Sequence, residues 1–341
     1  MHSRNSISRR RMLEITALGG VAAATGIRPG FAAAPAAPPT PRIERLDPAL
    51  DAIVATTEPV RWLAEGYGGD IGPAEGPLWI KEGGYLLFND IQASRRLKFT
   101  PGRGVTIDKE QTNRANGLTR DLQGRLLSAE HDSRRVTRTE SDGSITVIAN
   151  SFQGKRLLRP NDVIVKSDGA IYFTDPGGPA AAEQWDVEYT GVYRVTPDLG
   201  TITLLTEEFI GPNGLAFSPD ERILYICDSR RRHVRAFDLL PNGTLAKQTG
   251  RLIADLSGAE PGNPDGIKVD VAGNLYTGGA GGLWILDANG KKLVRIVHGQ
   301  AATTNMAFGG DDWKTLYFTN RSHLGMVVLR NAGVPVPARK A

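Results

Sequence analysis

The sequence repeats one short pattern six times, and this repetition limits most strongly what the chain can fold into. Each copy has a polar residue, an apolar run, a turn rich in Gly, Asp or Asn, and a second apolar run. Two apolar runs joined by such a turn predict an antiparallel β-hairpin. The first polar residues, here called the markers, are Glu75, Asn116, Asn161, Asn213, Asp265 and Asn305, and they are spaced by 41, 45, 52, 52 and 40 residues.

A second pair of apolar runs follows most of these hairpins. Residues 95–100 and 104–108 follow the first hairpin, and residues 191–195 and 202–206 follow the third. Four short strands in every 40 to 50 residues are typical of a propeller blade. We therefore predict an all-β chain that forms a six-bladed β-propeller with four-stranded antiparallel blades. A many-stranded β-sandwich is the alternative, but it does not explain a period that is held six times.

The last repeat lacks its fourth strand, because only one apolar run, near residues 324–330, follows its hairpin. Residues 59–65 resemble the strand that precedes each later hairpin. We expect this N-terminal strand to pair with the final blade, which closes the ring and leaves no open sheet edge. The propeller domain is accordingly placed at residues 58–341.

The N-terminal segment carries a predicted export signal. Residues 8–13 read SRRRML and resemble a twin-arginine signal, and a Gly/Ala-rich stretch follows. We therefore assign residues 1–34 to a signal read by the twin-arginine export machinery, expect a periplasmic location, and treat residues 35–57 as a linker. The apolar stretch is too short and too Gly-rich for stable membrane insertion.

The net charge of +4 also belongs to this segment. Residues 1–34 contain five arginines and one glutamate, so the remainder of the chain is neutral overall. The high isoelectric point therefore gives no reason to expect a nucleic-acid partner.

The markers are expected to meet at one mouth of the propeller channel. The start of a hairpin's first strand and the end of its second strand lie at the same edge. Glu75 should thus lie beside Asp90, and Asn213 beside Asp228, with the turns at the opposite edge. The acids expected at the marker edge are Asp90, Glu130, Asp175 and Asp228.

The chemistry of the markers favours a hard cation. All six offer oxygen atoms, and none is His or Cys. Carboxylates with carboxamide oxygens suit Ca²⁺ or Mg²⁺, whereas zinc prefers nitrogen or sulfur ligands. Asn-Gly and Asp-Gly are also common turn dipeptides, so each marker taken alone has a purely structural alternative.

Several of these segments resemble one known family. They are EGPLW from Glu75, RPND from Arg159, PNGLAFSPDERILYICDS from Pro212, NPDGIKVDVAGNLY from Asn263 and TTNMAFGGDD from Thr303. Together they are similar to the senescence marker protein/gluconolactonase family, the regucalcin-like metal-dependent lactonases, over residues 58–330. The resemblance implies a six-bladed propeller with a divalent metal in its channel. It implies Ca²⁺ first, with Zn²⁺, Mn²⁺ or Mg²⁺ as alternatives.

The resemblance also implies roles for individual residues. Glu75, Asn213 and Asp265 would hold the metal, and Asn161 would face either the metal or the substrate. Arg159 would contact the substrate. The segment from Asn116 to Arg138 is similar to the bacterial gluconolactonase branch, in which a Glu-His pair follows the second hairpin.

These residues suggest a metal-dependent hydrolase that opens a sugar lactone. Asp265 is either the group that accepts a proton or only a ligand, and Asn161 and Asn116 would orient hydroxyl groups or the oxyanion. Arg159 would grip substrate oxygens, or form a salt bridge at the rim. His131 would contact the substrate and shuttle a proton, or only support the structure.

Two further functions remain open from the sequence. The first is a promiscuous lactonase or phosphotriesterase on the same scaffold, and the second is a propeller that binds a ligand without catalysis. The insertion at residues 177–191, with Glu183, Trp185 and Tyr189, begins on the marker side and is expected to line or cover the pocket.

Overall fold

The computed structural model describes residues 40–178, 185–300 and 302–337. Most of the regular structure in these ranges is β-strand, and the helical segments are short 3-10 turns such as Lys81–Gly83 (η2) and Lys247–Thr249 (η4). No helix within these ranges is long and apolar enough to cross a membrane. The export signal predicted for residues 1–34 lies outside the described residues.

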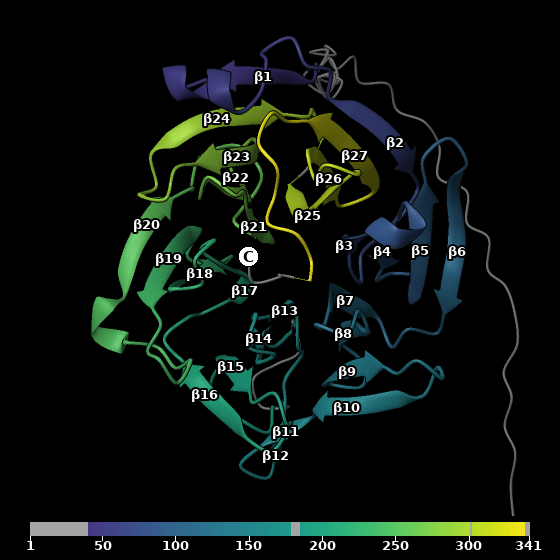
Figure 1. Cartoon of the computed structure of the whole chain (residues 1–341), viewed down its shortest axis with the longest axis vertical. Helices are drawn as coiled ribbons and strands as arrows, with labels where there is room; N and C mark the ends of the chain where they lie inside the picture. Colours follow the sequence, from purple (N-terminus) through teal and green to yellow (C-terminus); the bar gives the residue numbers. More distant parts are fainter. Residues whose placement is uncertain (1–39, 179–184, 301, 338–341) are drawn as a thin grey trace, which may run out of the picture. The chain divides into compact units, whose positions relative to one another are not determined.

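Six antiparallel sheets follow one another along the described chain and surround a common axis (Figure 1). Blades one to three consist of β3 (Ala74–Ile80), β4 (Tyr85–Asp90), β5 (Arg95–Thr100) and β6 (Gly104–Glu110); β7 (Ala115–Arg120), β8 (Leu126–Glu130), β9 (Arg135–Thr139) and β10 (Ile145–Ala149); and β13 (Val163–Val165), β14 (Ile171–Asp175), β15 (Gly191–Val195) and β16 (Ile202–Thr206). A short hairpin, β11 (Ser151–Phe152) with β12 (Lys155–Arg156), separates blades two and three.

The second half of the ring has the same plan. Blades four to six consist of β17 (Pro212–Phe217), β18 (Ile223–Asp228), β19 (His233–Asp238) and β20 (Arg251–Asp255); β21 (Ile267–Val269), β22 (Leu275–Gly279), β23 (Gly282–Leu286) and β24 (Lys292–Val297); and β25 (Thr303–Gly309), β26 (Thr315–Asn320) and β27 (His323–Val328) with an N-terminal strand. The innermost strands contact one another in ring order, from β3 through β7, β13, β17, β21 and β25 back to β3. The predicted six-bladed propeller is confirmed.

The hydrophobic core lies between the blades. The described part of the chain has six clusters of buried side chains, and each joins two neighbouring blades. Blades three and four, for example, meet through Tyr172, Leu215 and Phe237. Since both faces of an inner blade are covered, the innermost strand β3 is buried along nearly its whole length, whereas the outermost strand β6 is mainly exposed.

The N-terminal strand closes the ring as predicted. β2 (Arg61–Glu65) pairs antiparallel with β27, with Arg61 opposite Met326 and Glu65 opposite His323. The sixth blade thus takes its outermost strand from the start of the domain and the other three from its end. This arrangement leaves no unpaired gap between blades six and one.

The structure differs from the linker expected at residues 35–57. β1 (Arg42–Arg45) pairs with β24 as a fifth strand of blade five, and the turn η1 (Pro48–Ala52) follows it. Leu50, Ile53 and Val54 are buried in the cluster between blades five and six. Burying these apolar side chains is more favourable than leaving them in water, as they would be in a linker. Residues 42–54 therefore belong to the propeller.

Candidate functional site

A β-bulge places the first marker of blade one at the channel. The pairing between β3 and β4 slips between Glu75 and Leu78, and comparable slips occur in β7 at Ala115–Leu118 and in β17 at Pro212–Leu215. An extra residue in one strand bends it and re-aims a side chain. The Gly that follows each of these markers therefore belongs to a β-bulge, and we expect this bulge to turn the marker side chain toward the axis.

The glycine after a marker allows neighbouring blades to approach closely. Gly76 has φ +56°, and a β-carbon there would lie 1.9 Å from the carbonyl oxygen of Asn116. A β-carbon at Gly214 would lie 2.3 Å from the carbonyl oxygen of Asp265. Only glycine accommodates both the conformation at Gly76 and these distances. The Asn-Gly and Asp-Gly pairs are thus needed for the ring as well as for turns.

Hydrogen bonds connect the six blades in a closed circuit at the level of the markers. Each bond joins a donor of one blade to a marker carbonyl, or to the carbonyl before a marker, in the next blade. In ring order they are Asn89 Nδ2 to Asn116 O (2.6 Å), Gly117 N to Asn161 O (2.8 Å), Thr174 Oγ1 to Asn213 O (2.7 Å), Gly214 N to Asp265 O (2.9 Å), Gly266 N to Thr304 O (2.7 Å) and Thr304 Oγ1 to Ala74 O (2.7 Å). The markers therefore lie next to one another around the channel.

The carboxylates of the markers Glu75 and Asp265 interact electrostatically. Glu75 is 2% exposed, and burial raises its pKa above the usual range. Burial also raises the pKa of Asp265 well above its usual value, and repulsion from Glu75 adds to the effect. Two carboxylates held together out of water favour a cation between them or a shared proton.

The marker amides leave oxygen atoms without protein partners. Asn213 donates from Nδ2 to Ser229 Oγ at 3.0 Å and is hydrogen-bonded to the Asp265 carboxylate, while its buried Oδ1 has no partner among the described residues. The buried Oδ1 of Asn116 likewise has no hydrogen-bond partner among the described residues. Because a buried oxygen without a partner is costly, each of these atoms calls for a ligand, a water or an ion.

This donor set fits a hard divalent cation. Glu75 and Asp265 supply charge, and Asn213 supplies a free amide oxygen. No group of three or more His, Cys, Asp or Glu side chains in the described ranges is arranged to hold a metal, so a site here would need amide oxygens to complete its ligands. Asn161 is connected to the ring through its backbone, and its side chain is partly buried.

Arg159 and His131 lie together on the marker side. Burial lowers the pKa of His131 well below its usual value, and the positive charges of Arg159 and Arg114 lower it further. The imidazole is therefore neutral. Its Nε2 lies 3.3 Å from the side-chain amide of Asn116. His131 thus contacts the side chain of Asn116, and both the proton-shuttle role and the supporting role stay predictions.

A model of the SMP-30/gluconolactonase/LRE-like region matches residues 73–322. The chain belongs to this family. A gluconolactonase of Zymomonas mobilis is 32% identical over 307 residues, which cover 83% of this chain and 84% of that protein. A pentonolactonase of Haloferax volcanii is 30% identical over 250 residues, which cover 72% of this chain and 80% of that protein.

A solved structure in the SMP-30/gluconolactonase family agrees with the fold. It is a gluconolactonase from Xanthomonas campestris, 31% identical, with a TM-score of 0.72, and the match covers 89% of this chain and 99% of that one. The family resemblance drawn from the sequence motifs is confirmed. The predicted class, a hydrolase of lactone esters, agrees with the names of these relatives.

The acids at the ends of the second strands have a structural role. Asp90 lies opposite Ala74, and Glu75 lies opposite Asn89, so the predicted pairing of Glu75 with Asp90 is wrong by one residue. Asp90 accepts hydrogen bonds from Gly68 N and from Arg95. One residue of offset turns a strand side chain to the other face of its sheet, and here that face meets the loops instead of the channel.

The other three acids behave alike. Asp175 accepts from the backbone N–H groups of Leu158 and Arg159, and Asp228 accepts from those of Ile210 and Gly211. Glu130 accepts from Asn113, Ser133, Arg135 and Thr137. By accepting its two hydrogen bonds, Asp175 fixes the backbone at Arg159, the substrate-binding candidate.

The insertion in blade three is only partly described, and Glu183 lies outside the described residues. Trp185 packs against Gly177, where an added β-carbon would lie 2.5 Å from its ring. Tyr189 is hydrogen-bonded to Tyr193, a buried residue of β15. Trp185 therefore remains near the marker side, whereas Tyr189 packs onto its own blade.

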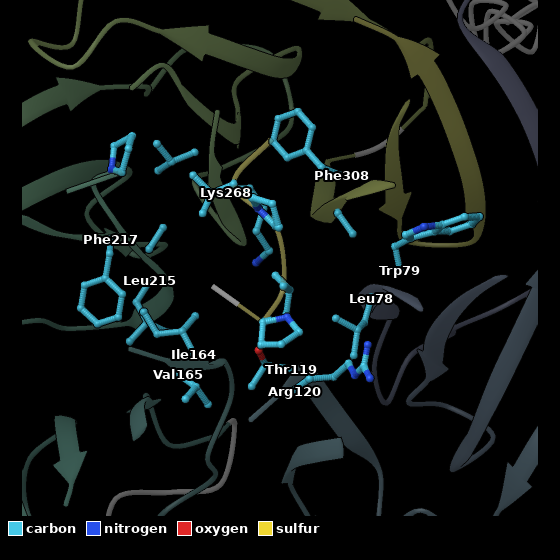
Figure 2. Close-up of a pocket in the computed structure, with 18 of the residues that line it drawn as sticks. Leu78, Trp79, Thr119, Arg120, Ile164, Val165, Leu215, Phe217, Lys268 and Phe308 are labelled. Atoms are coloured by element: carbon cyan, nitrogen blue, oxygen red, sulfur yellow. The ribbon is translucent and has the colours of Figure 1, made fainter. Parts of the chain in front are cut away.

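A cavity of about 410 Å³ occupies the channel on the side of the hairpin turns (Figure 2). Its walls are residues that follow the markers along the inner strands, including Leu78, Leu215 and Phe308, together with the C-terminal residues 334–337. It therefore lies at the opposite end of the channel from the predicted mouth. No sequence pattern predicted a cavity here.

Two residues next to the markers, Asp162 and Lys268, were missing from the predicted site, and both lie close to the marker Asn305 or to each other. Asp162 and Asn305 are each 2% exposed. Lys268 is among the residues that line the cavity (Figure 2). A signal for Lys268 was present in the sequence, because it is a charged residue inside the short apolar strand β21. Asp162 directly follows the marker Asn161, and Asn305 is itself a marker.

Proposed function

We propose that this protein is a divalent-metal-dependent lactonase that opens a sugar lactone. The observation that carries the proposal is the marker ring, where Glu75 and Asp265 repel each other and the amide oxygens of Asn213 and Asn116 lack partners. The relatives named gluconolactonase and pentonolactonase supply the substrate class.

The ring residues would divide the work of lactone opening. A bound divalent cation supplies Lewis-acid chemistry that polarises a carbonyl group. Asp265 accepts the proton of the attacking water as the water oxygen adds to the carbonyl carbon. The ring C–O bond then breaks, and Asp265 returns the proton to the leaving ring oxygen, which gives the hydroxy acid. Arg159 stabilises the negative charge on the substrate, and Asn161 and Asn116 hold its hydroxyl groups.

Ca²⁺ is the proposed ion, with Mg²⁺, Mn²⁺ and Zn²⁺ as alternatives. The donor atoms are carboxylate and amide oxygens, which match the preferences of Ca²⁺. A zebrafish protein that is 27% identical over 256 residues is named regucalcin, and a structural neighbour from Agrobacterium tumefaciens with the same fold is described as calcium-binding.

The test is lactone opening by the purified protein. Chelated protein should open aldonolactones no faster than buffer, as followed by acid release in a pH-stat, and added Ca²⁺ should restore turnover. Mn²⁺, Mg²⁺ and Zn²⁺ are compared at the same concentration, and organophosphate esters test the phosphotriesterase alternative. If no lactone is opened above the blank with any of these ions, the proposal fails.

The variant Asp265→Asn separates the two roles of Asp265. A calorimetric titration measures whether the variant still binds the ion. Retained binding with a loss of turnover of about a hundredfold or more supports a proton-accepting role, as expected for general-base catalysis. Loss of binding shows that Asp265 is needed as a ligand.

Export to the periplasm is proposed on the arginines of the N-terminal segment. The variant with Arg9→Lys and Arg10→Lys should stay in the cytoplasmic fraction, while the parent protein is recovered from the periplasm. Equal distribution of both proteins would contradict this route.

A further inference from the structure

A buried polar layer crosses the channel directly beneath the marker ring. Lys268 Nζ lies 3.9 Å from Asp162 Oδ2 and 3.5 Å from Asn305 Oδ1. The three residues come from blades three, five and six. Figure 2 shows the Lys268 side chain near the middle of the cavity that it helps to line.

Asn305 connects this layer to the ring. Its Oδ1 accepts hydrogen bonds from Met306 N at 2.8 Å and from Lys268 Nζ. Its amide group is also hydrogen-bonded to the carboxylates of Glu75 and Asp162. Each polar atom of Asn305 is thus in use, and a change at Lys268 reaches Glu75 through one intervening side chain.

The layer borders the cavity on the turn side, where the C-terminal residues partly cover it. Residues 334–337 line the cavity there, and Val334 N donates to Val269 O at 3.0 Å, next to Lys268. The Lys268 side chain is 22% exposed, and the Asp162 side chain is 2% exposed. Charges act more strongly on one another when apolar walls replace water around them.

The charges at this level explain why a fixed cation is useful. Glu75, Asp162 and Asp265 together carry three negative charges when ionised, and Lys268 carries one positive charge. The formal remainder of two negative charges equals what one divalent ion neutralises. Without the ammonium group, three carboxylates would face each other around the metal-free channel, at a large desolvation cost.

We infer that Lys268 is a positioning residue, a built-in cation that holds Asp162 and Asn305 in place and limits how tightly the ring binds its divalent ion. The inference rests on the proposed function, because it assumes that the divalent ion binds at the marker ring. The polar contacts of Lys268 are with Asp162 and Asn305. It acts through Asn305 on Glu75 and by its charge on the ring.

The test compares four variants of the intact chain. They are Lys268→Met, Lys268→Arg, Asp162→Asn and the double variant that combines Lys268→Met with Asp162→Asn. Ca²⁺ binding is measured by calorimetry on chelated protein, and the thermal midpoint is measured without metal. Lys268→Met should bind Ca²⁺ at least tenfold more tightly, because one repulsive charge is gone, and its metal-free midpoint should fall by several degrees. Asp162→Asn should bind Ca²⁺ at least tenfold more weakly.

The two remaining variants provide the controls. Lys268→Arg keeps the charge and should stay near the parent protein in both measurements. The double variant removes both partners and should return the metal-free midpoint and the Ca²⁺ affinity toward the parent values. A merely structural lysine would lower the midpoint without tightening Ca²⁺ binding, so unchanged or weaker binding by Lys268→Met overturns the inference.

Failure of the proposed function gives a different result. If the parent protein binds no divalent ion at all, the proposed metal site is wrong. The metal-free midpoints then decide the role of Lys268 alone. A midpoint that falls in Lys268→Met and recovers in the double variant retains the charge-balancing role, and a midpoint that does not recover ends it.

Discussion

The hydroxyl of Thr304 donates a hydrogen bond to the carbonyl oxygen of Ala74 at 2.7 Å, across 230 residues of sequence. It joins the last blade to the first, immediately before Glu75. The ring of blade-to-blade hydrogen bonds is closed by this contact. The position of a metal-ligand candidate near the start of the chain thus depends on a residue near its end.

Replacing Thr304 should loosen this closure. Thr304→Val leaves the buried carbonyl of Ala74 without its donor, so we expect unfolding free energy to fall by about 1 to 3 kcal/mol. Urea unfolding measures the change. Thr106→Val on the exposed strand β6 is the control and should change stability by less than about 0.5 kcal/mol. Equal effects of the two substitutions would contradict the closing role.

The N-terminal segment should behave as part of the core. Leu50 is fully buried in the cluster between blades five and six, whereas Leu46 nearby is 45% exposed. Leu50→Ala should cost about 2 to 5 kcal/mol of unfolding free energy, and Leu46→Ala should cost much less. Chemical denaturation of both variants is the measurement. If Leu50→Ala is as mild as its control, residues 42–54 act as a linker after all.

Stability should decline in mild acid because of His298. Burial lowers the pKa of His298 to about 4, and its Nε2 lies 2.7 Å from Thr303 Oγ1. The unfolded chain takes up this proton near pH 6.5 and the folded chain only near pH 4, so stability from this group is present above pH 6.5 and is lost as the pH falls toward 4. The loss is up to about 3 kcal/mol. His298→Gln should flatten the stability curve in this window, and an unchanged curve would exclude His298 as the cause.

His131 offers a test between proton transfer and positioning. Gln retains an acceptor for the amide of Asn116, so His131→Gln should keep lactone turnover within a few fold. His131→Leu removes that acceptor and should lower kcat/KM by about tenfold or more. A proton shuttle predicts large and equal losses in both, on the order of a hundredfold. Steady-state kinetics on one aldonolactone distinguishes the two outcomes.

The C-terminal residues should act as a cover at the turn side of the channel. A chain that ends after Gly333 loses the contact from Val334 N to Val269 O and uncovers Leu78 and Phe308 in the cavity. We expect increased fluorescence of an apolar dye and a lower thermal midpoint, with KM for the lactone changed less than about twofold. A large rise in KM would mean that the substrate uses this end of the channel.

Much of this architecture can be predicted from short stretches of the sequence. The hairpin period predicts the six blades, and it places Glu75, Asn213 and Asp265 at equivalent positions because each hairpin forms from neighbouring residues. The closing strand at residues 59–65 follows from counting. Propeller blades are repeated local units, so their number and their inner strands are readable without any long-range information.

The tertiary structure decided what depends on contacts between distant segments. The pairing of Arg42–Arg45 with β24, the one-residue offset that turns Asp90 toward the loops, and the meeting of Asp162, Lys268 and Asn305 all involve register or burial that no local pattern encodes. A lysine in an apolar strand has no evident partner until the ring is closed. The sequence by itself determined where the hairpins begin and which polar residues stand at their starts. Only the folded ring decided which side chains meet at the channel and which charges face each other there, because electrostatic interactions depend on distance and burial rather than on order along the chain.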